Sequence, residues 1–296
     1  MIKKISLIIN PASGRSGRIA GKIETCFKGS VLDWNIDLTE KAGDAQTLAH
    51  KALEQGRDAI GVIGGDGTLK EAAQAVKGTE CALAIFPAGT GNVLANELKV
   101  EANVKKWCRS LIEGQYVERR IDVGTCNGRS FLVRVCCGYE AQLVKSTPWR
   151  LKTQIGWLAY AFGGFKALLK AGSSVYQVEC DGIRQEFKGL SFVVANSTNL
   201  GITGVNFWPF SRVDDGWLDF FVIRKADIER LLASDLRRRE AGLVREFFIH
   251  KKIKRVRISV EGRQEVHMDG DLIGEGSLEI GLLPGGLKLI IPRQRK

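Results

Sequence analysis

No stretch of this sequence is apolar for long enough to cross a membrane. The most apolar stretch runs from Trp157 to Phe165, well short of the ~20 residues that a spanning helix needs. The apolar run near the N-terminus ends at Asn10-Pro11, too early for the core of a secretory signal peptide. The seven cysteines form no C-x-x-C pair, which favours reduced thiols in a cytosol. The sequence therefore predicts a cytoplasmic protein without a transmembrane segment, which reaches a membrane only peripherally.

Several common binding signatures are also missing. There is no G-x-x-x-x-G-K-[ST] and no G-x-G-x-x-G motif, so neither a P-loop NTPase nor an ordinary dinucleotide dehydrogenase is supported. No helix-turn-helix, zinc or RNA-binding signature accompanies the net charge of +11, so we predict no nucleic-acid partner. A positive charge of this size still favours an anionic partner, either a nucleotide or the surface of an acidic membrane.

The 296 residues, 44% of them hydrophobic and 26% charged, suit a folded protein of two domains. The first part of the chain alternates between short apolar runs and helical spacing. This rhythm predicts an α/β fold with a doubly wound parallel sheet, which we assign to a nucleotide-binding domain over residues 1–121. Asp44 is the expected N-cap of the second helix. The expected strands are Ile5–Ile9, Trp34–Leu38, Ala59–Ile63 and Ala82–Phe86, and the expected helices are Arg15–Phe27, Asp44–Gln55, Thr68–Val76 and Asn92–Leu98.

The pattern changes near Asp122, after which most apolar runs have the length of strands linked by hairpins. Asp181-Gly182 and Asp269-Gly270 are typical hairpin-turn dipeptides. We predict a second, β-rich domain over residues 122–296, an antiparallel sandwich whose last strand returns to the first domain. The expected strands are Phe131–Val135, Val175–Cys180, Leu190–Ala195, Trp217–Ile223, Val256–Val260 and Leu287–Ile291, and helical stretches are expected at Ile155–Lys170 and Ile228–Glu240.

Glycine-rich loops follow three of the predicted parallel strands. The carboxyl ends of parallel strands meet at one edge of a sheet, where open α/β folds bind ligands. Glycines let backbone N–H groups approach an anion closely, and each following helix adds its N-terminal dipole. One such loop can reflect turn geometry alone, but three at one edge predict a phosphate site. The loops are Asn10-Pro11-Ala12-Ser13-Gly14, Gly64-Gly65-Asp66-Gly67-Thr68 and Pro87-Ala88-Gly89-Thr90-Gly91-Asn92.

These loop sequences resemble the catalytic domain of the diacylglycerol kinase family, which includes sphingosine and ceramide kinases. The resemblance extends over nearly the whole chain, because four further segments occur in the family's order. It implies the fold shared by NAD kinases and diacylglycerol kinases, and an ATP-dependent lipid kinase acting on diacylglycerol. The further segments are Ile121-Asp122-Val123-Gly124, Gly138-Tyr139-Glu140-Ala141, Val193-Val194-Ala195-Asn196 and Asp214-Asp215-Gly216-Trp217-Leu218-Asp219.

The resemblance also implies which residues bind ATP and catalyse transfer. Asp66 and Asp271 are the expected catalytic residues, with Asp66 acting through Mg²⁺ or the transferred group. The family has a glutamate where this chain has Asp271, so the carboxylate here reaches about 1.5 Å less far. The base therefore stays open between Asp271, Asp66 and Glu275. The expected ATP contacts are Asn10, Pro11, Ala12, Ser13, Gly14, Thr39, Gly64, Gly65, Asp66, Gly67, Thr68, Gly89, Thr90, Gly91 and Asn92.

Two further implications concern a metal ion and the third loop. The family binds Mg²⁺ in its second domain, and the matching ligands are the Asp215 carboxylate with the backbone carbonyls of Arg212 and Trp217. Asp122 is expected to join through water, and an ordinary surface turn is the alternative interpretation of these residues. Val93 follows the third loop where many relatives have an acidic residue, so the surroundings of that loop become more apolar.

A kinase for a membrane lipid must contact the bilayer. Basic and aromatic residues gather at 145–162, and basic residues recur at 237–239 and 251–257. Such stretches suit an anionic surface, although core packing and solvated faces are alternatives. The expected partner is a lipid substrate at the inner membrane face, and strand pairing between β-rich domains leaves a homodimer open.

Two other functions stay open. An NAD kinase shares the Gly64–Thr68 motif and the two-domain plan, but it requires an Asn-Glu pair where this chain has its third glycine loop. Asn96-Glu97 is present, but on a predicted helix after that loop. The other alternative is a nucleotide-binding regulatory protein that has lost catalysis, which only the replacement at Asp271 favours.

Overall fold

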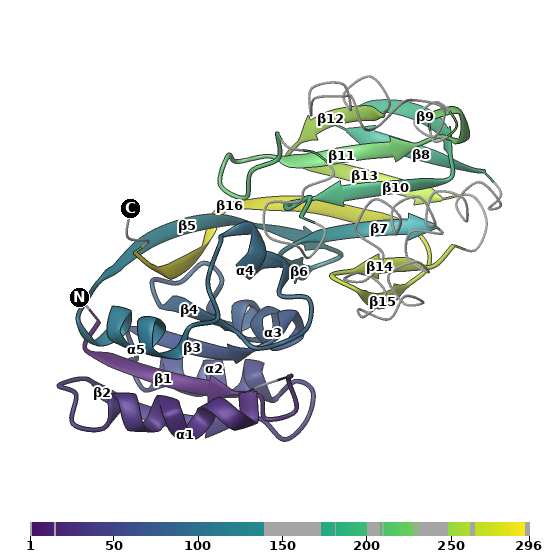
Figure 1. The fold of residues 1–296 in the computed structure, drawn as a ribbon. Helices are drawn as coiled ribbons and strands as arrows, with labels where there is room; N and C mark the ends of the chain where they lie inside the picture. Colours follow the sequence, from purple (N-terminus) through teal and green to yellow (C-terminus); the bar gives the residue numbers. More distant parts are fainter. Residues whose placement is uncertain are drawn as a thin grey trace.

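The computed structural model describes residues 2–14, 16–138, 173–180, 182–199, 208, 210–227, 229, 248–260 and 264–293. An N-terminal α/β part and a C-terminal antiparallel β sandwich follow one another along the chain (Figure 1). The predicted fold class is therefore confirmed. None of the described helices is long and apolar enough to span a membrane.

The N-terminal part contains every strand and helix expected there, within one or two residues. One further helix, α5, was not expected. Asn103 before it is its N-cap, and the side chain of Asn103 accepts a hydrogen bond from the N–H of Lys106. The elements are β1 (Lys4–Ile9), α1 (Ser16–Phe27), β2 (Asp33–Leu38), α2 (Asp44–Glu54), β3 (Ala59–Gly64), α3 (Asp66–Val76), β4 (Ala82–Pro87), α4 (Val93–Glu97) and α5 (Val104–Ile112).

The parallel strands of this part lie in the order β2-β1-β3-β4. Alternate side chains of β1 point to opposite faces: Ile8 packs with α2 and α3, whereas Leu7 packs with α1 and α5. Helices thus cover both faces of the sheet, which explains why β1, β3 and β4 are almost continuously apolar. This is the doubly wound arrangement that the sequence predicted.

Two long strands connect the parallel sheet to the sandwich (Figure 1). They are β5 (Tyr116–Cys126) and β16 (Leu278–Pro292), which pair antiparallel along most of their length. The C-terminal part of β16 also pairs parallel with β4, where Leu289 lies beside Leu83. The first part of β16 pairs with β13 (Arg255–Val260), so one sheet of ten strands runs through both parts of the chain.

The sandwich core lies between the far end of this sheet and a second sheet of six strands in the order β12-β11-β10-β7-β14-β15. Large apolar side chains from both sheets meet there, among them Tyr176, Phe192, Phe220 and Ile258. The remaining strands are β6 (Arg129–Phe131), β7 (Arg134–Gly138), β8 (Ser174–Cys180), β9 (Ile183–Gly189), β10 (Ser191–Ala195), β11 (Leu218–Ile223), β12 (Ile249–Ile253), β14 (Val266–Met268) and β15 (Asp271–Gly274).

Some local expectations were wrong. Phe131–Val135 is not one strand: β6 ends at Phe131 and β7 begins at Arg134, because the intervening N–H groups bond to the carboxylate of Asp269. Asp44 is not the N-cap of α2; that position is Gly43, while the Asp44 carboxylate accepts hydrogen bonds from Glu40 and Lys41 before the helix. The helical stretch expected at residues 155–170, and nearly all of that at 228–240, lie outside the described residues.

Candidate active site

The three glycine loops pack directly against one another at the carboxyl edge of the parallel sheet. A Cβ on Gly14 would lie 2.2 Å from the carbonyl oxygen of Ala88, and a Cβ on Gly89 would lie 2.5 Å from Cα of Gly65. A Cβ on Gly65 would also come within 3.2 Å of Oγ of Ser13. A side chain at Gly14 or Gly89 would therefore force the loops apart.

Side-chain hydrogen bonds hold the loops in this arrangement. Nδ2 of Asn10 donates to Oγ1 of Thr68 at 3.0 Å, which joins the first loop to α3. In the third loop, Asn92 exchanges two hydrogen bonds with the backbone of Gly89, at 3.1 and 2.7 Å. Asn92 has φ 49°, a left-handed conformation that asparagine tolerates better than most residues. The two asparagines thus shape the backbone of the loops.

Asp66 connects the second loop to the third. It begins α3, but its Oδ1 accepts the N–H of Val93 at 2.7 Å, at the first residue of α4. A Cβ on Gly91 would lie 2.8 Å from Oδ2 of Asp66, so this approach requires a glycine there. Burial raises the pKa of the Asp66 carboxyl; the N–H of Val93 opposes that change and the charge of Asp269 adds to it. A proton or a cation at this carboxylate would therefore be favoured.

The remaining predicted nucleotide residues lie at the same edge. Thr39 directly follows β2, and its N–H donates to the carbonyl of Ile9 at 3.0 Å, beside the first loop. A small cavity opens beneath the second and third loops and is lined by Val62, Gly64, Gly65, Asp66, Leu69, Ile85, Pro87, Asn92 and Ala95. The predicted residues from strands β1, β2, β3 and β4 are thus brought together by the parallel sheet.

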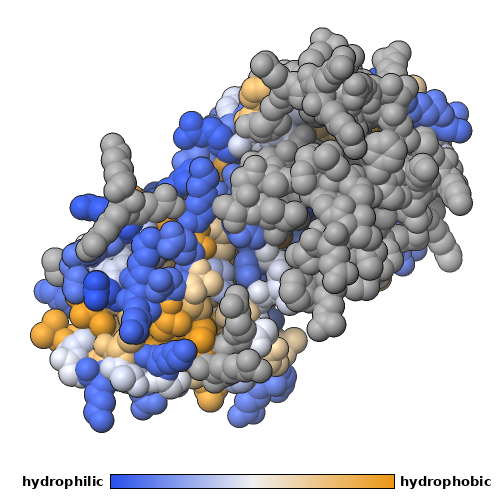
Figure 2. All heavy atoms as spheres, viewed as in Figure 1, coloured by the Kyte–Doolittle hydropathy of each residue, from blue (hydrophilic) through white to orange (hydrophobic). Residues whose placement is uncertain are grey.

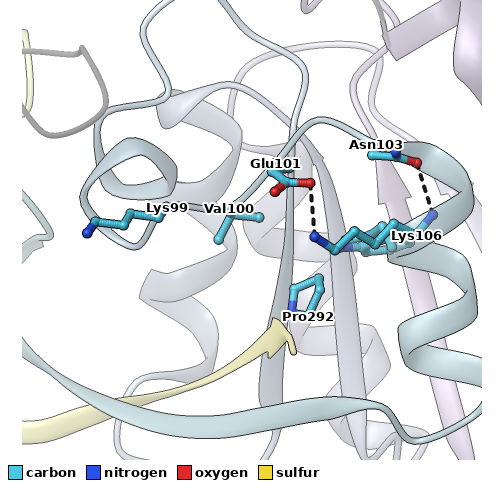
Figure 3. Close-up of a pocket in the computed structure, with 7 residues that line it drawn as sticks. Lys99, Val100, Glu101, Asn103, Lys106 and Pro292 are labelled. Atoms are coloured by element: carbon cyan, nitrogen blue, oxygen red, sulfur yellow. Dashed lines mark hydrogen bonds and ion pairs between the residues drawn. The ribbon is translucent and has the colours of Figure 1, made fainter. Parts of the chain in front are cut away.

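A second hollow lies between the start of α5 and the end of β16 (Figure 3). In it, Lys106 pairs with Glu101 at 3.0 Å, and its backbone N–H donates to Oδ1 of Asn103 at 3.0 Å. The hollow contains none of the predicted site residues. Its lining is Lys99, Val100, Glu101, Asn103, Lys106, Trp107 and Pro292.

The hairpin of β14 and β15 carries the Asp269-Gly270-Asp271 segment, as the turn dipeptide predicted. Asp269 has φ 50°, and its carboxylate accepts hydrogen bonds from the N–H groups of Leu132, Val133 and Arg134 at 2.7, 2.9 and 2.9 Å. Burial raises the pKa of the Asp269 carboxyl against the opposing effect of these N–H groups. Asp269 therefore fixes the hairpin against the start of β7. This role of Asp269 was not expected, because an aspartate in a turn dipeptide carries no sequence signal of these hydrogen bonds.

Asp271, the first residue of β15, reaches back to the N-terminal part of the chain. Its Oδ2 is paired with Nζ of Lys70, which lies on α3 one helical turn beyond Asp66. Lys70 also influences the ionisation of Asp269, and Asp269 that of Asp66. The two predicted catalytic aspartates are therefore brought to the same region by α3 and the hairpin. Glu275, the other candidate base by type, is exposed in the bend that follows β15.

The predicted metal residues also come together, at the junction of β5, β11 and β16. Asp122 is buried, and its two carboxylate oxygens accept the N–H groups of Gly216 and Gly285, each at 2.7 Å. Oδ1 of Asp215 accepts the N–H of Trp217 at 3.1 Å, and its Oδ2 is paired with Lys252. The described residues include no cluster of three or more histidine, cysteine or acidic side chains arranged to hold a metal.

The neighbouring Asp214 is engaged differently. It bonds to Arg119 at 2.8 Å and to Arg212 at 3.2 Å. Although burial acts in the opposite direction, these guanidinium groups hold the pKa of the Asp214 carboxyl below its usual range. The side chain of Arg212 thus serves an ion pair, which leaves only its backbone carbonyl for the predicted metal role.

Two known families match the two parts of the chain. Residues 4–126 match the family described as the diacylglycerol kinase catalytic domain, and residues 133–291 match the YegS C-terminal NAD kinase beta sandwich-like domain. This chain belongs to the diacylglycerol kinase family. It is a lipid kinase that uses ATP, and the likeness to NAD kinases concerns the sandwich.

Individual members of the family resemble the chain over its full length. The diacylglycerol kinase of Bacillus subtilis (strain 168) is 26% identical over 300 residues, which cover 99% of this chain and 98% of that protein. The diacylglycerol kinase of Staphylococcus saprophyticus is 28% identical, covering 93% of this chain and 91% of that protein. A solved structure of a diacylglycerol kinase from Bacillus anthracis superimposes with a TM-score of 0.78 at 26% identity, covering 98% of this chain and 97% of that one.

Proposed function

We propose that this lipid kinase transfers the γ-phosphoryl group of ATP to the free hydroxyl of diacylglycerol. The observation that carries the proposal is the meeting of α3 with the β14–β15 hairpin. This places Asp271, a candidate base, beside the helix that begins in the second glycine loop. The names of the relatives support diacylglycerol as the acceptor.

The glycine loops are suited to bind the phosphates of ATP. Their glycines leave the backbone bare at the carboxyl edge, and α3 directs its N-terminal dipole to the same place. We propose that the residues of the three loops, with Thr39, contact the nucleotide. In this arrangement Asn10 and Asn92 act mainly through the loop backbone that they hold.

In the proposed reaction, the hydroxyl oxygen of the lipid attacks the γ-phosphorus as the bond to the bridging oxygen of ADP breaks. The hydroxyl proton passes to the carboxylate of Asp271, which is 61% exposed and so accessible to an acceptor. Asp66 is less suited to that role, because it is less exposed to an acceptor than Asp271 is. We propose that Asp66 instead favours a cation near the phosphates, in keeping with its buried carboxylate.

We further propose that Mg²⁺ binds at the turn before β11. A carboxylate with backbone carbonyls is a donor set that a hard cation prefers, and Asp215, Arg212 and Trp217 would supply it. Asp122 fits a role through water, since both of its oxygens already accept backbone N–H groups. Lys252 now neutralises Asp215 and would have to move from the carboxylate for the ion to bind.

The test is radiolabel transfer from γ-labelled ATP to a lipid panel in mixed micelles, with NAD as a soluble control. Wild type runs beside Asp271→Asn and beside Glu275→Gln, which changes an exposed carboxylate just after the same hairpin. We expect labelled diacylglycerol that is lost with Asp271→Asn and kept with Glu275→Gln. Labelled NAD alone would refute the lipid acceptor. ATP binding without any transfer would instead favour the regulatory alternative.

We also propose peripheral contact with an anionic membrane. Lys251, Lys252 and Lys254 lie at one edge of the sandwich, and Lys254 stacks on the exposed ring of Trp217 at 4.7 Å. The space-filling view shows hydrophilic side chains mixed with hydrophobic areas over the part of the surface that it colours (Figure 2). The basic stretches at 145–152 and 237–239, and the aromatic stretch at 157–162, lie outside the described residues. Co-sedimentation with anionic and with neutral vesicles tests the contact, and equal binding to both would refute it.

A homodimer is a further proposal. Among the described strands, β9 is exposed and forms an edge of the larger sheet, where strand pairing with a second copy would be possible. Light scattering of the purified protein would reject it by giving the mass of a monomer.

A further inference from the structure

Lys70 has an unusual position for a lysine on the surface of a helix. It lies in the second turn of α3, and its side chain is only 18% exposed, whereas its partner Asp271 is 61% exposed. The ammonium of Lys70 is therefore the more buried of the two groups and is held by the helix. The carboxylate of Asp271 on the hairpin is more exposed and has more freedom to move. In such a pair, the lysine limits where the carboxylate can lie more than the reverse.

The charges around Lys70 reinforce this constraint. Its ammonium also favours the ionised form of Asp269, against the burial that raises the pKa of that carboxyl. Asp269 in turn raises the pKa of Asp66. Asp269 and Asp271, which flank Gly270 in the hairpin, thus both interact with Lys70, and Asp66 interacts with Asp269. Without Lys70, the carboxylate of Asp271 would lose the ion pair that holds it to α3.

The direction of the contact matters as much as its charge. Asp66 and Lys70 are four residues apart on α3 and so share one face of the helix. Asp66 borders the glycine loops, so a carboxylate drawn to Lys70 is drawn toward those loops. An aspartate has only two side-chain torsions, so a single strong contact to its carboxylate removes most of the rotational freedom of the side chain.

We propose that Lys70 is a positioning residue that holds the carboxylate of Asp271 toward the phosphate-binding loops. This inference rests on the proposed function, in which Asp271 accepts the hydroxyl proton. It gives the ion pair a task other than stability, because an ion pair whose carboxylate is 61% exposed contributes little to the free energy of unfolding. The contact joins residues 201 positions apart, so it forms only when α3 and the hairpin are assembled.

The experiment measures kcat and KM for ATP and the melting temperature of Lys70→Gln, Lys70→Arg and Lys77→Gln. Lys77 is the matched control: it follows the same helix and donates to Oγ of Ser130 in β6 at 2.7 Å, away from the hairpin. For Lys70→Gln we expect kcat to fall by about tenfold to a hundredfold, the size of effect that a misplaced catalytic group produces. KM for ATP and the melting temperature should change little. Lys70→Arg keeps a cation and should keep most of kcat, and Lys77→Gln should behave as wild type.

A rescue variant separates positioning from a general effect of charge. Glutamate reaches about 1.5 Å further than aspartate, so it depends less on being drawn toward the loops. Adding Asp271→Glu to Lys70→Gln should therefore recover a substantial part of the lost kcat. A positioning role predicts this recovery, whereas a purely structural role of Lys70 does not.

The possible outcomes are distinct. Wild-type kcat in Lys70→Gln would overturn the inference and leave the lipid kinase function intact. A rise in KM for ATP alone would overturn it as well, because Lys70 would then bind the nucleotide. The same loss in Lys70→Arg as in Lys70→Gln, or no recovery in the double variant, would also reject positioning. If wild type labels no lipid at all, the proposed function fails, and this inference fails with it.

Discussion

Gly14 offers the sharpest test of the idea that the three loops form one packed phosphate site. Its φ of 54° lies in the left-handed region, which a residue with a Cβ rarely adopts. A Cβ there would also meet the carbonyl oxygen of Ala88 at 2.2 Å, whereas ordinary contact begins at 3.4 Å. Gly14→Ala therefore combines backbone strain with a direct collision between the first and third loops.

The two effects can be given magnitudes. A left-handed conformation costs an ordinary residue about 1–2 kcal/mol. Overpacking in a close-packed region adds about 1–3 kcal/mol. The melting temperature should then fall by roughly 4–20 °C, at about 2–4 °C for each kcal/mol in a chain of this size. Relief of the collision requires the loops to separate by about 1 Å, and a displacement of that size can reduce turnover by about 10²-fold.

Two other glycines separate the contributions. Gly89→Ala meets Cα of Gly65 at 2.5 Å without a positive φ, so it should show the packing effect alone. Gly67 has open space around its Cβ position and lies within α3, where alanine is favoured over glycine by about 0.5–1 kcal/mol. Differential scanning calorimetry should give a lower melting temperature for Gly14→Ala than for Gly89→Ala, and one at or above that of wild type for Gly67→Ala. ATP titration should rank the affinities of Gly14→Ala and Gly89→Ala in the same order.

A Gly14→Ala variant that melts and binds ATP as wild type does would refute the packed phosphate site. A Gly67→Ala variant as unstable as Gly14→Ala would refute the explanation by backbone angle and distance. In that case any added side chain near the loops is harmful, and neither the backbone angle nor the distance to Ala88 explains the loss.

Two further predictions follow from the buried carboxylates. The pKa of Asp66 is higher in the folded state than in the unfolded state. Between these two pKa values the folded state retains a proton that the unfolded state has lost, so the free energy of unfolding falls as the pH rises. Asp66→Asn removes this term, so its melting temperature relative to wild type should increase from about pH 4 to about pH 7.5; a constant or shrinking difference would contradict the sign. Asp269→Ala leaves the N–H groups of Leu132, Val133 and Arg134 without their acceptor. At about 1–3 kcal/mol for each buried group, urea unfolding should show a loss of several kcal/mol. Glu275→Ala just after the same hairpin should be neutral, and an equal loss there would reject the assignment.

The sequence by itself determined the strands, the helices and the loops of the N-terminal part. Apolar runs such as Ala59–Gly64 are local signals, because a strand buried on both faces needs apolar residues throughout. The placing of the three loops at one edge also followed from the sequence, since consecutive parallel strands end on the same side of a sheet. Helix α5 was missed in spite of its Asn103 cap, and the break between β6 and β7 could not be read from an uninterrupted apolar run.

Only the tertiary structure decided how the second half of the chain completes the site. The pairing of Lys70 with Asp271, and the hydrogen bonds that the Asp269 carboxylate accepts from the start of β7, join residues that are more than a hundred positions apart. No local pattern records such contacts, because a charged side chain in a turn has the same sequence signal whether it faces water or a partner. Their geometry depends on how two sheets and a helix pack together, which side-chain periodicity along one strand or helix does not specify.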